Sequence, residues 1–199
     1  MGIQEISFDK SLEEFDRIGI AYSGGLDSTV LLHALSRETT LKSKINAIHV
    51  NHSISADSDK WEELCKKNAD ELGVKFFSYK LESLKNISED NLRKIRYEKF
   101  NHWASTNDLI LTAHHKDDQV ETIIFRFFRG TGLNGLKGIP AWRKDGNSLF
   151  HRPLLDIHKG ELYELSLIHI SEPTRRRGIW VSGVGVKKKG GGGGGGGGG

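Results

Sequence analysis

Four short apolar runs, each followed by a stretch with helical character, constrain the fold more than any other feature of this chain. The runs are residues 17–22, 45–50, 74–79 and 108–113. They show little alternation of apolar and polar residues, which is typical of strands covered on both faces. The helical stretches are residues 28–38, 58–73, 88–105 and 116–130. Repeated strand–helix units predict a doubly wound α/β fold, a parallel sheet with helices on both faces. Ligands of such folds bind at the carboxyl ends of the strands, which makes the turns after residues 22, 50, 79 and 113 the places to search.

The first of these turns reads SGGLDS, from Ser23 to Ser28. A glycine pair lets the backbone adopt positive φ and approach a ligand closely, and the start of a helix favours phosphate. The loop lacks the lysine and spacing of a Walker A motif. Asp27 is the informative residue, because a carboxylate beside a phosphate is repulsive unless a cation lies between them. The turn predicts a phosphate site with Mg²⁺ on Asp27.

Two further regions carry candidate ligand groups. In the helical stretch 88–105, Arg96 lies in line with the apolar Leu92 and Phe100, and Arg93 precedes it. A cation on a packing face needs a carboxylate or phosphate partner, unless its long stem carries it to solvent. In the second turn, His52 lies beyond the strand end and within reach of a ligand.

The turn after residue 113 is the richest in polar groups. His114, His115, Asp117, Asp118 and Glu121 form a dense cluster, which can bind Mg²⁺, bind a cationic substrate or act as a base. The simpler interpretation is that Asp117 or Asp118 caps the helix. Four glycines then follow Arg129 in RGTGLNGLKG (residues 129–138), which predicts a mobile loop able to fold over a substrate.

These motifs carry a resemblance to a known family. SGGLDS after a first strand resembles the pyrophosphate loop (PP-loop) of the N-type ATP pyrophosphatases. HHKDDQVET (114–122), RGTGLNGLKGIP (129–140) and RPLL (152–155) narrow the resemblance to the tRNA(Ile)-lysidine synthases, and NLRKIRY (91–97) resembles the arginine-containing helix of that family. The resemblance covers essentially all of residues 15–160.

The resemblance implies a C–N ligase with ATP and Mg²⁺ as cofactors. Such an enzyme adenylates O2 of the wobble cytidine in tRNA(Ile) with a CAU anticodon and releases pyrophosphate. The ε-amine of free L-lysine then displaces AMP. The implied ATP-binding residues are Ser23, Gly24, Gly25, Leu26, Asp27 and Ser28, with Asp27 also the metal ligand. The implied catalytic residues are Asp27, His114, Asp118 and Glu121, and the implied substrate or tRNA contacts are Arg93, Arg96, Arg129 and Lys137.

Two alternatives stay open. Another PP-loop enzyme such as a tRNA thiolase shares the first loop, but it uses paired cysteines, and this chain has only Cys65. The second alternative is a fragment that binds ATP without catalysis. A homodimer is among the oligomeric states that the sequence leaves open.

The end of the chain differs from the rest in composition. Residues 165–199 carry six basic residues and one acidic residue, and finish in ten glycines. The overall net charge of +3 therefore arises from this tail and does not indicate a nucleic-acid partner by itself. Leu165 to Arg175 resembles a translated sequencing adapter. We expect a catalytic domain over residues 1–164, incomplete at its C-terminal side, and a non-native, disordered read-through over 165–199. With no signal peptide or long apolar run, we expect a cytoplasmic protein without membrane contact.

Overall fold

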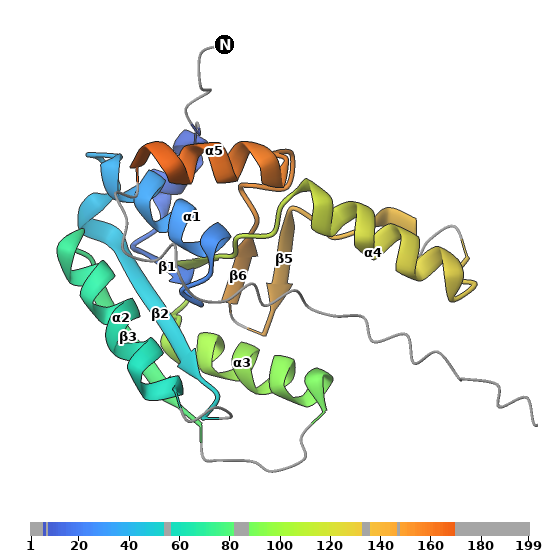
Figure 1. The fold of residues 1–199 in the computed structure, drawn as a ribbon, viewed down its shortest axis with the longest axis horizontal. Coiled ribbons are helices and arrows are strands. Elements are labelled where there is room, and N and C mark those ends of the chain that lie inside the picture. Colours follow the sequence, from blue (N-terminus) through green and yellow to red (C-terminus); the bar gives the residue numbers. More distant parts are fainter. Residues whose placement is uncertain are drawn as a thin grey trace, which may run out of the picture.

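The computed structural model describes residues 6, 8–53, 57–81, 88–132, 136–146 and 148–169. Its centre is a six-stranded sheet in the order β3-β2-β1-β4-β6-β5 (Figure 1). All neighbouring strands are parallel except the β5–β6 pair, which is antiparallel. The strands are β1 (Arg17–Ala21), β2 (Ile45–Asn51), β3 (Lys75–Lys80), β4 (Asp108–Leu111), β5 (Trp142–Asp145) and β6 (Ser148–His151).

Helices cover both faces of this sheet, as the sequence predicts. The α-helices are α1 (Leu26–Arg37), α2 (Ser58–Glu71), α3 (Glu89–Trp103), α4 (Lys116–Phe128) and α5 (Lys159–His169), and the short 3₁₀ helices are η1 (Lys10–Glu14) and η2 (Lys42–Lys44). Buried side chains of α1, α2, α5 and η1 form one core. Those of α3 form a second core on the opposite face. The predicted doubly wound α/β fold is confirmed.

The alternation of side chains along the central strands supplies both cores. In β1, Ile18 and Ile20 point into the first core, and Gly19 faces the second. A Cβ at Gly19 would lie 2.4 Å from Ile48 Cδ1 and 2.7 Å from Trp103 Cζ3. Glycine at this position therefore lets Trp103 of α3 pack directly onto the sheet.

The structure contains elements that the sequence analysis did not predict. These are the β5–β6 hairpin, helix α5 and the two 3₁₀ helices. Strand β6 pairs with β4, which places the RPLL segment beside the carboxyl end of β4. The expected boundary after Glu164 falls inside α5, where Leu165 and Ser166 are buried. Among the described residues, no helix combines the length and hydrophobicity needed to span a bilayer.

Helix α4 differs from the other long helices because it covers neither face of the sheet. It starts at the carboxyl end of β4 and extends away from the body of the molecule (Figure 1). None of its residues is buried.

Candidate active site

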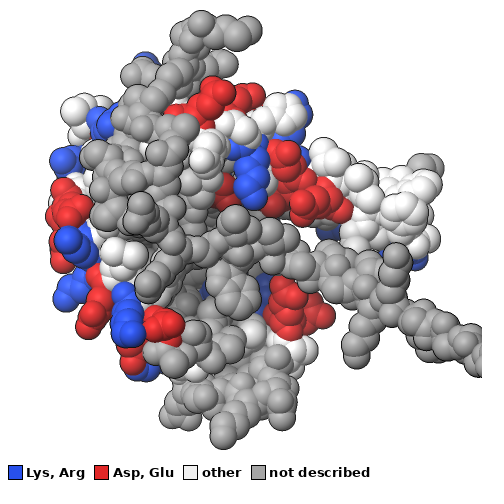
Figure 2. Space-filling model, viewed as in Figure 1, with Lys and Arg blue, Asp and Glu red and all other residues white. Residues whose placement is uncertain are grey.

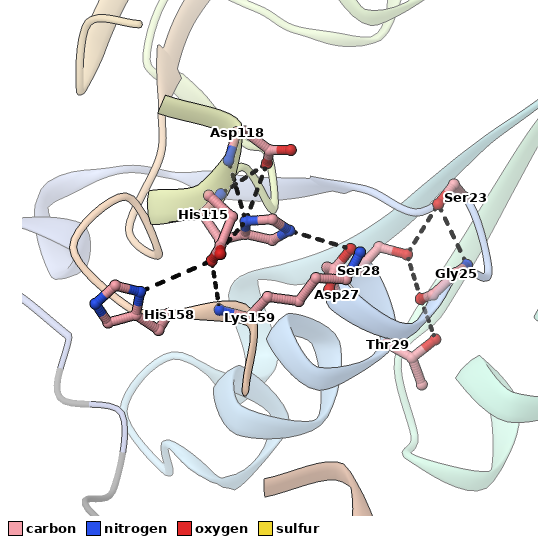
Figure 3. A network of polar contacts seen from close by, with 10 residues as sticks. Ser23, Gly25, Asp27, Ser28, Thr29, His115, Asp118, His158 and Lys159 are labelled. Carbon is pink, nitrogen blue, oxygen red and sulfur yellow. Dashed lines mark hydrogen bonds and ion pairs between the residues drawn. The ribbon is translucent and has the colours of Figure 1, made fainter. Parts of the chain in front are cut away.

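The turn between β1 and α1 presents open backbone N–H groups. Gly24 has φ +78°, and Gly25 is the N-cap residue of α1 without a side-chain capping bond. The hydroxyls of Ser28 and Thr29 both donate to the carbonyl oxygen of Gly25, at 3.0 and 2.9 Å. Ser23 Oγ lies 3.1 Å from Ser28 Oγ and accepts from the Gly25 N–H (Figure 3). The loop is therefore held by its own hydroxyls, and the start of α1 has no side-chain cap, which leaves it in a form that suits phosphate.

Helix α2 packs against this loop and restrains its conformation. The indole Nε1 of Trp61 donates to the Ser23 carbonyl oxygen at 2.9 Å. A Cβ at Gly24 would lie 2.5 Å from Cys65 Sγ and 2.8 Å from Trp61 Nε1. Glycine is thus required at this position both by its φ and by the close approach of α2. Burial raises the pKa of the Cys65 thiol to about 12, which keeps it a neutral packing group.

Asp27 is a carboxylate without a sufficient partner. Its Oδ1 is buried and accepts no hydrogen bond from the described residues. Its Oδ2 lies 3.8 Å from Nε2 of His115. Burial raises the pKa of Asp27, against the opposing effects of His115 and Lys159. A cation at this carboxylate would supply the charge that the site lacks.

That environment fits the expected Mg²⁺. Among the described residues, no group of three or more His, Cys, Asp or Glu side chains could hold a metal by itself. Mg²⁺ typically takes one or two carboxylates and completes its shell with water and substrate phosphates. One unpartnered carboxylate beside a phosphate loop matches that pattern.

The turn after β4 brings the second set of predicted residues to Asp27. His115 is the N-cap of α4, and it forms a reciprocal capping box with Asp118. The His115 N–H donates to Asp118 Oδ2 at 2.9 Å, and the Asp118 N–H donates to His115 Nδ1 at 3.3 Å. Capping is therefore one role of Asp118, as the simpler interpretation held. The same geometry leaves the other ring nitrogen of His115 directed at Asp27 (Figure 3).

Helix α5 contributes a group that the sequence analysis missed. The Lys159 backbone N–H donates to Asp117 Oδ2 at 2.7 Å, which joins the start of α5 to the start of α4. The Lys159 side chain extends toward Asp27 and Ser28 (Figure 3). This places a cation at the PP-loop from a helix about 130 residues further along the chain. No short motif around Lys159 signals that position.

His114 lies in a different environment from its neighbour His115. Its Nδ1 is 2.9 Å from Thr112 Oγ1. Burial lowers the pKa of His114 to about 4, and the positive charges of Arg152 and Arg93 act in the same direction. His114 is therefore a neutral imidazole at physiological pH.

Arg152, the first residue of the RPLL segment, is the second group without an assigned role in the sequence analysis. It is 2% exposed, and its Nη1 donates to the Pro140 carbonyl oxygen at 2.6 Å. Its Nε is buried and has no hydrogen-bond partner among the described residues. A buried guanidinium with a donor left over points to an anion beside His114.

The other predicted residues lie outside this inner network. Arg96 Nη2 is 3.1 Å from His52 Nε2, so its observed partner is an imidazole. The Arg93 guanidinium lies 5.8 Å from the ring centroid of Tyr97, and that of Arg129 lies 4.1 Å from that of Phe125. Glu121 and Lys137 are exposed. Residues 133–135, part of the predicted mobile loop, lie outside the described residues. The roles of all these residues stay predictions.

Comparisons with known proteins agree with this geometry. A family model described as a PP-loop domain matches residues 3–170. A tRNA(Ile)-lysidine synthase from Pseudomonas fluorescens is 42% identical over 146 residues, which is 72% of this chain and 33% of that relative. A tRNA(Ile)-lysidine synthase from Legionella pneumophila is 35% identical over 159 residues, 79% of this chain and 37% of that relative. The chain thus spans about a third of the length of these curated relatives.

Solved structures show the same fold at low sequence identity. The U34-tRNA thiolase NcsA from Methanococcus maripaludis, solved with its [4Fe-4S] cluster, superposes with a TM-score of 0.63 at 16% identity. The superposition covers 86% of this chain and 63% of the thiolase chain. A glutamine-dependent NAD⁺ synthetase from Acinetobacter baumannii has a TM-score of 0.50 at 16% identity, over 79% of this chain and 30% of its own.

Proposed function

Because the chain belongs to the PP-loop domain family, we propose that it binds ATP at residues 23–28 and carries the catalytic chemistry of tRNA(Ile)-lysidine formation. The family match supports ATP binding, and the named relatives support the tRNA reaction. The observation that carries the proposal is the 3.8 Å approach of His115 Nε2 to Asp27 Oδ2. It joins the ATP loop to the HHKDDQVET segment, so Asp27 and His115, which are 88 residues apart in the sequence, form one site.

The first step is adenylation of the cytidine. O2 of the base attacks the α-phosphorus of ATP, the bond from that phosphorus to the α,β-bridging oxygen breaks, and pyrophosphate leaves. The N–H groups at the start of α1 and the hydroxyls of Ser23 and Ser28 bind the departing phosphates. Lys159 adds a positive charge from α5. Mg²⁺, held by Asp27, would neutralise phosphate charge when bound.

The second step joins lysine to C2 of the base. The ε-nitrogen of lysine attacks C2, the C2–O bond to AMP breaks, and the ammonium loses a proton. An amine attacks only in its neutral form, so a carboxylate must bind the ammonium and accept the proton. Asp118 and Glu121 supply carboxylates at the start of α4, and Asp118 is already oriented by the capping box. His114, which is neutral, supplies an uncharged hydrogen-bonding group near Arg152.

Several cationic side chains around His114 are suited to binding phosphates of the tRNA. Arg152 and Arg93 both act on His114 electrostatically. Arg96, Arg129 and Lys137 extend the positive charge over α3, the end of α4 and the segment that follows it. We assign the cations at His114 to the phosphate next to the reacting nucleotide and the outer ones to more distant phosphates.

The experiment measures ATP-dependent incorporation of labelled lysine into tRNA(Ile) by the wild-type chain, by a variant of Asp118 and by a control variant. Asp118→Asn keeps an oxygen that can accept the His115 N–H but removes the charge. We expect it to lose at least about 100-fold in rate while its thermal stability is preserved. Asp90→Asn, in the first turn of α3, is the matched control. Full activity of Asp118→Asn would restrict Asp118 to capping and contradict the proposed mechanism.

The same assay decides between the alternatives. Sulfur incorporation in place of lysine incorporation would favour a thiolase. The neutral, buried Cys65 makes that outcome unexpected, because thiolate chemistry needs an ionised sulfur. ATP binding without either product would identify a nucleotide-binding fragment.

A further inference from the structure

Two adjacent aspartates at the start of α4 bind different partners. Asp118 accepts from the N–H of His115 and caps its own helix. Asp117 Oδ2 instead accepts from the backbone N–H of Lys159, the first residue of α5, at 2.7 Å. One of the N–H groups that a helix leaves open at its start is thus bonded by a side chain 42 residues earlier in the chain. The proposed reaction uses Asp118 and leaves Asp117 without a role.

Two further contacts join the start of α4 to the start of α5. The Lys116 N–H donates to the Ile157 carbonyl oxygen at 2.9 Å, and Asp117 Oδ2 lies 3.9 Å from Nδ1 of His158. The hydrogen bond from the Lys159 N–H holds the pKa of Asp117 below its usual range, so this carboxyl is ionised at neutral pH. The junction of the two helices therefore depends on one charged side chain.

The backbone of Lys159 is held in place from two directions. Its N–H is bonded to Asp117, and buried leucines of α5 pack into the first core. From this fixed origin the Lys159 side chain extends toward Asp27 and Ser28 (Figure 3). Burial raises the pKa of Asp27, and the charge of Lys159 is among the effects that oppose this shift. The ammonium of Lys159 thus acts at the PP-loop.

We propose that Asp117 is a positioning residue, which holds the start of α5 so that the Lys159 ammonium reaches the pyrophosphate part of ATP. The loop of residues 23–28 lacks the lysine of a Walker A motif, and Lys159 supplies a cation from another part of the chain. A long side chain binds more tightly when its backbone is already fixed, because less freedom is lost on binding. In this role Asp117 acts through Lys159 and not on the reacting atoms. The inference rests on the proposed ATP site and adds a residue to it.

Direct binding of the lysine substrate is the competing assignment for Asp117. It fits less well because the carboxylate already accepts a backbone hydrogen bond, and its Oδ2 also lies 3.7 Å from Nδ1 of His115. The neighbouring Asp118 and Glu121 do not make that bond to α5 and remain the carboxylates for the substrate ammonium.

The junction is accessible to substitution. Figure 2 shows acidic and basic side chains next to each other at the surface where α4 leaves the body of the molecule. The Asp117 side chain is 46% exposed, so replacing it opens no cavity in the core. Variants at this position should therefore keep the fold, which circular dichroism can verify.

Isothermal titration calorimetry of the full chain with inorganic pyrophosphate and MgCl₂ tests the inference without tRNA or lysine. Lys159→Met keeps a long stem and removes the charge, and we expect it to weaken pyrophosphate binding at least about 10-fold. Asp117→Ala should weaken it about 5-fold, since Lys159 stays charged but loses its fixed origin. Asp117→Asn keeps an oxygen that can accept the Lys159 N–H and should bind within about 2-fold of the wild type.

Two more variants separate positioning from a general effect on folding. If Asp117 acts through Lys159, the double variant Asp117→Ala with Lys159→Met should bind pyrophosphate no more weakly than Lys159→Met alone. Asp9→Ala is the matched control, because Asp9 Oδ1 likewise accepts a backbone N–H at a helix start, that of Ser11 in η1 at 2.8 Å. It removes a comparable cap and should bind pyrophosphate as the wild type does.

Three results would overturn the inference. Wild-type pyrophosphate affinity in Asp117→Ala would show that this carboxylate does not act on the phosphate site, and a loss of lysine incorporation in the same variant would assign it to the substrate. Wild-type affinity in Lys159→Met would remove Lys159 from that site. A double variant in which the two losses multiply would mean that Asp117 acts independently of Lys159. A chain that binds pyrophosphate but incorporates no lysine would contradict the proposed reaction alone, because the binding measurements would still decide the role of Asp117.

Discussion

Helices α1 and α4 start from neighbouring strands at the same edge of the sheet; α1 carries one acid in its first turn and α4 carries two. Seven residues of α1 are buried and none of α4 is. Both helices contain rows of leucine, isoleucine, valine or phenylalanine. In α1 these residues build the core of the chain, whereas in α4 they are not buried. The apolar content of a helix therefore does not tell whether its apolar side chains are buried in the folded chain or stay exposed on its surface.

The largest expected effect is a difference between α1 and α4 in how far truncating one apolar side chain lowers the free energy of unfolding. Leu31→Ala in α1 removes a fully buried side chain and should lower the free energy of unfolding by about 3 kcal/mol. Ile124→Ala in α4 should change it by less than about 0.5 kcal/mol. Urea denaturation at a protein concentration that keeps the chain monomeric measures both. Equal losses would mean that α4 is buried within the monomer.

The next effect is the pH dependence of stability that His114, in the turn before α4, produces. The depressed pKa of His114, about 4, means that the unfolded chain takes up a proton first as the pH falls. The free energy of unfolding is therefore independent of His114 above about pH 6.5, and it decreases from there toward pH 4 by at most about 3 kcal/mol. His114→Gln should reduce this slope in denaturation curves measured across that range. An unchanged slope would contradict the burial of His114.

A smaller effect contrasts the glycines of the two regions. Gly24→Ala should destabilise the chain by about 2 kcal/mol, because it combines positive φ with a clash against Cys65 and Trp61. It should also weaken ATP binding. A Cβ at Gly132, after α4, meets no atom within 4 Å, so Gly132→Ala is the matched control. Thermal unfolding and nucleotide titration of both variants make the comparison.

The smallest expected effect has the opposite sign. Burial raises the pKa of Asp27, so ionising this carboxyl costs stability as the pH rises above the usual carboxyl range. Asp27→Asn removes that charge and should raise the free energy of unfolding by about 0.5–1 kcal/mol while it abolishes lysine incorporation. Differential scanning calorimetry without nucleotide measures the gain. A loss of stability would show that the ionised Asp27 is well compensated in the folded protein.

The sequence predicted the parts of the fold that depend on local patterns. Each of the four apolar runs became a strand, and each was followed by its helix. The β5–β6 hairpin escaped detection because its strands have four residues each and β5 is exposed, which leaves little periodic signal. The exposure of α4 could not be predicted, since an apolar helical period indicates a contact face but not its partner.

For the candidate site too, the sequence predicted only the residues that lie in short motifs. The sequence placed Asp27 and Asp118 at the carboxyl ends of two strands, and the structure shows that these strands are neighbours and brings the two residues into one network through His115. It gave no role to Lys159 or Arg152, because these residues reach the site only through the packing of α5 and the pairing of β6 with β4. Contacts across such distances along the chain depend on tertiary structure, which short motifs do not record.

The bond from the Trp61 indole to the Ser23 carbonyl has an optical consequence. Indole emission depends on the polarity and hydrogen bonding around the ring, and this ring is both partly exposed and bonded to the PP-loop itself. Nucleotide entry that shifts Ser23 would change that environment directly. Trp103, by contrast, is buried in the core on the other face of the sheet. The chain thus carries a native fluorophore at the phosphate loop, and a change in its emission would report loop occupancy without any label.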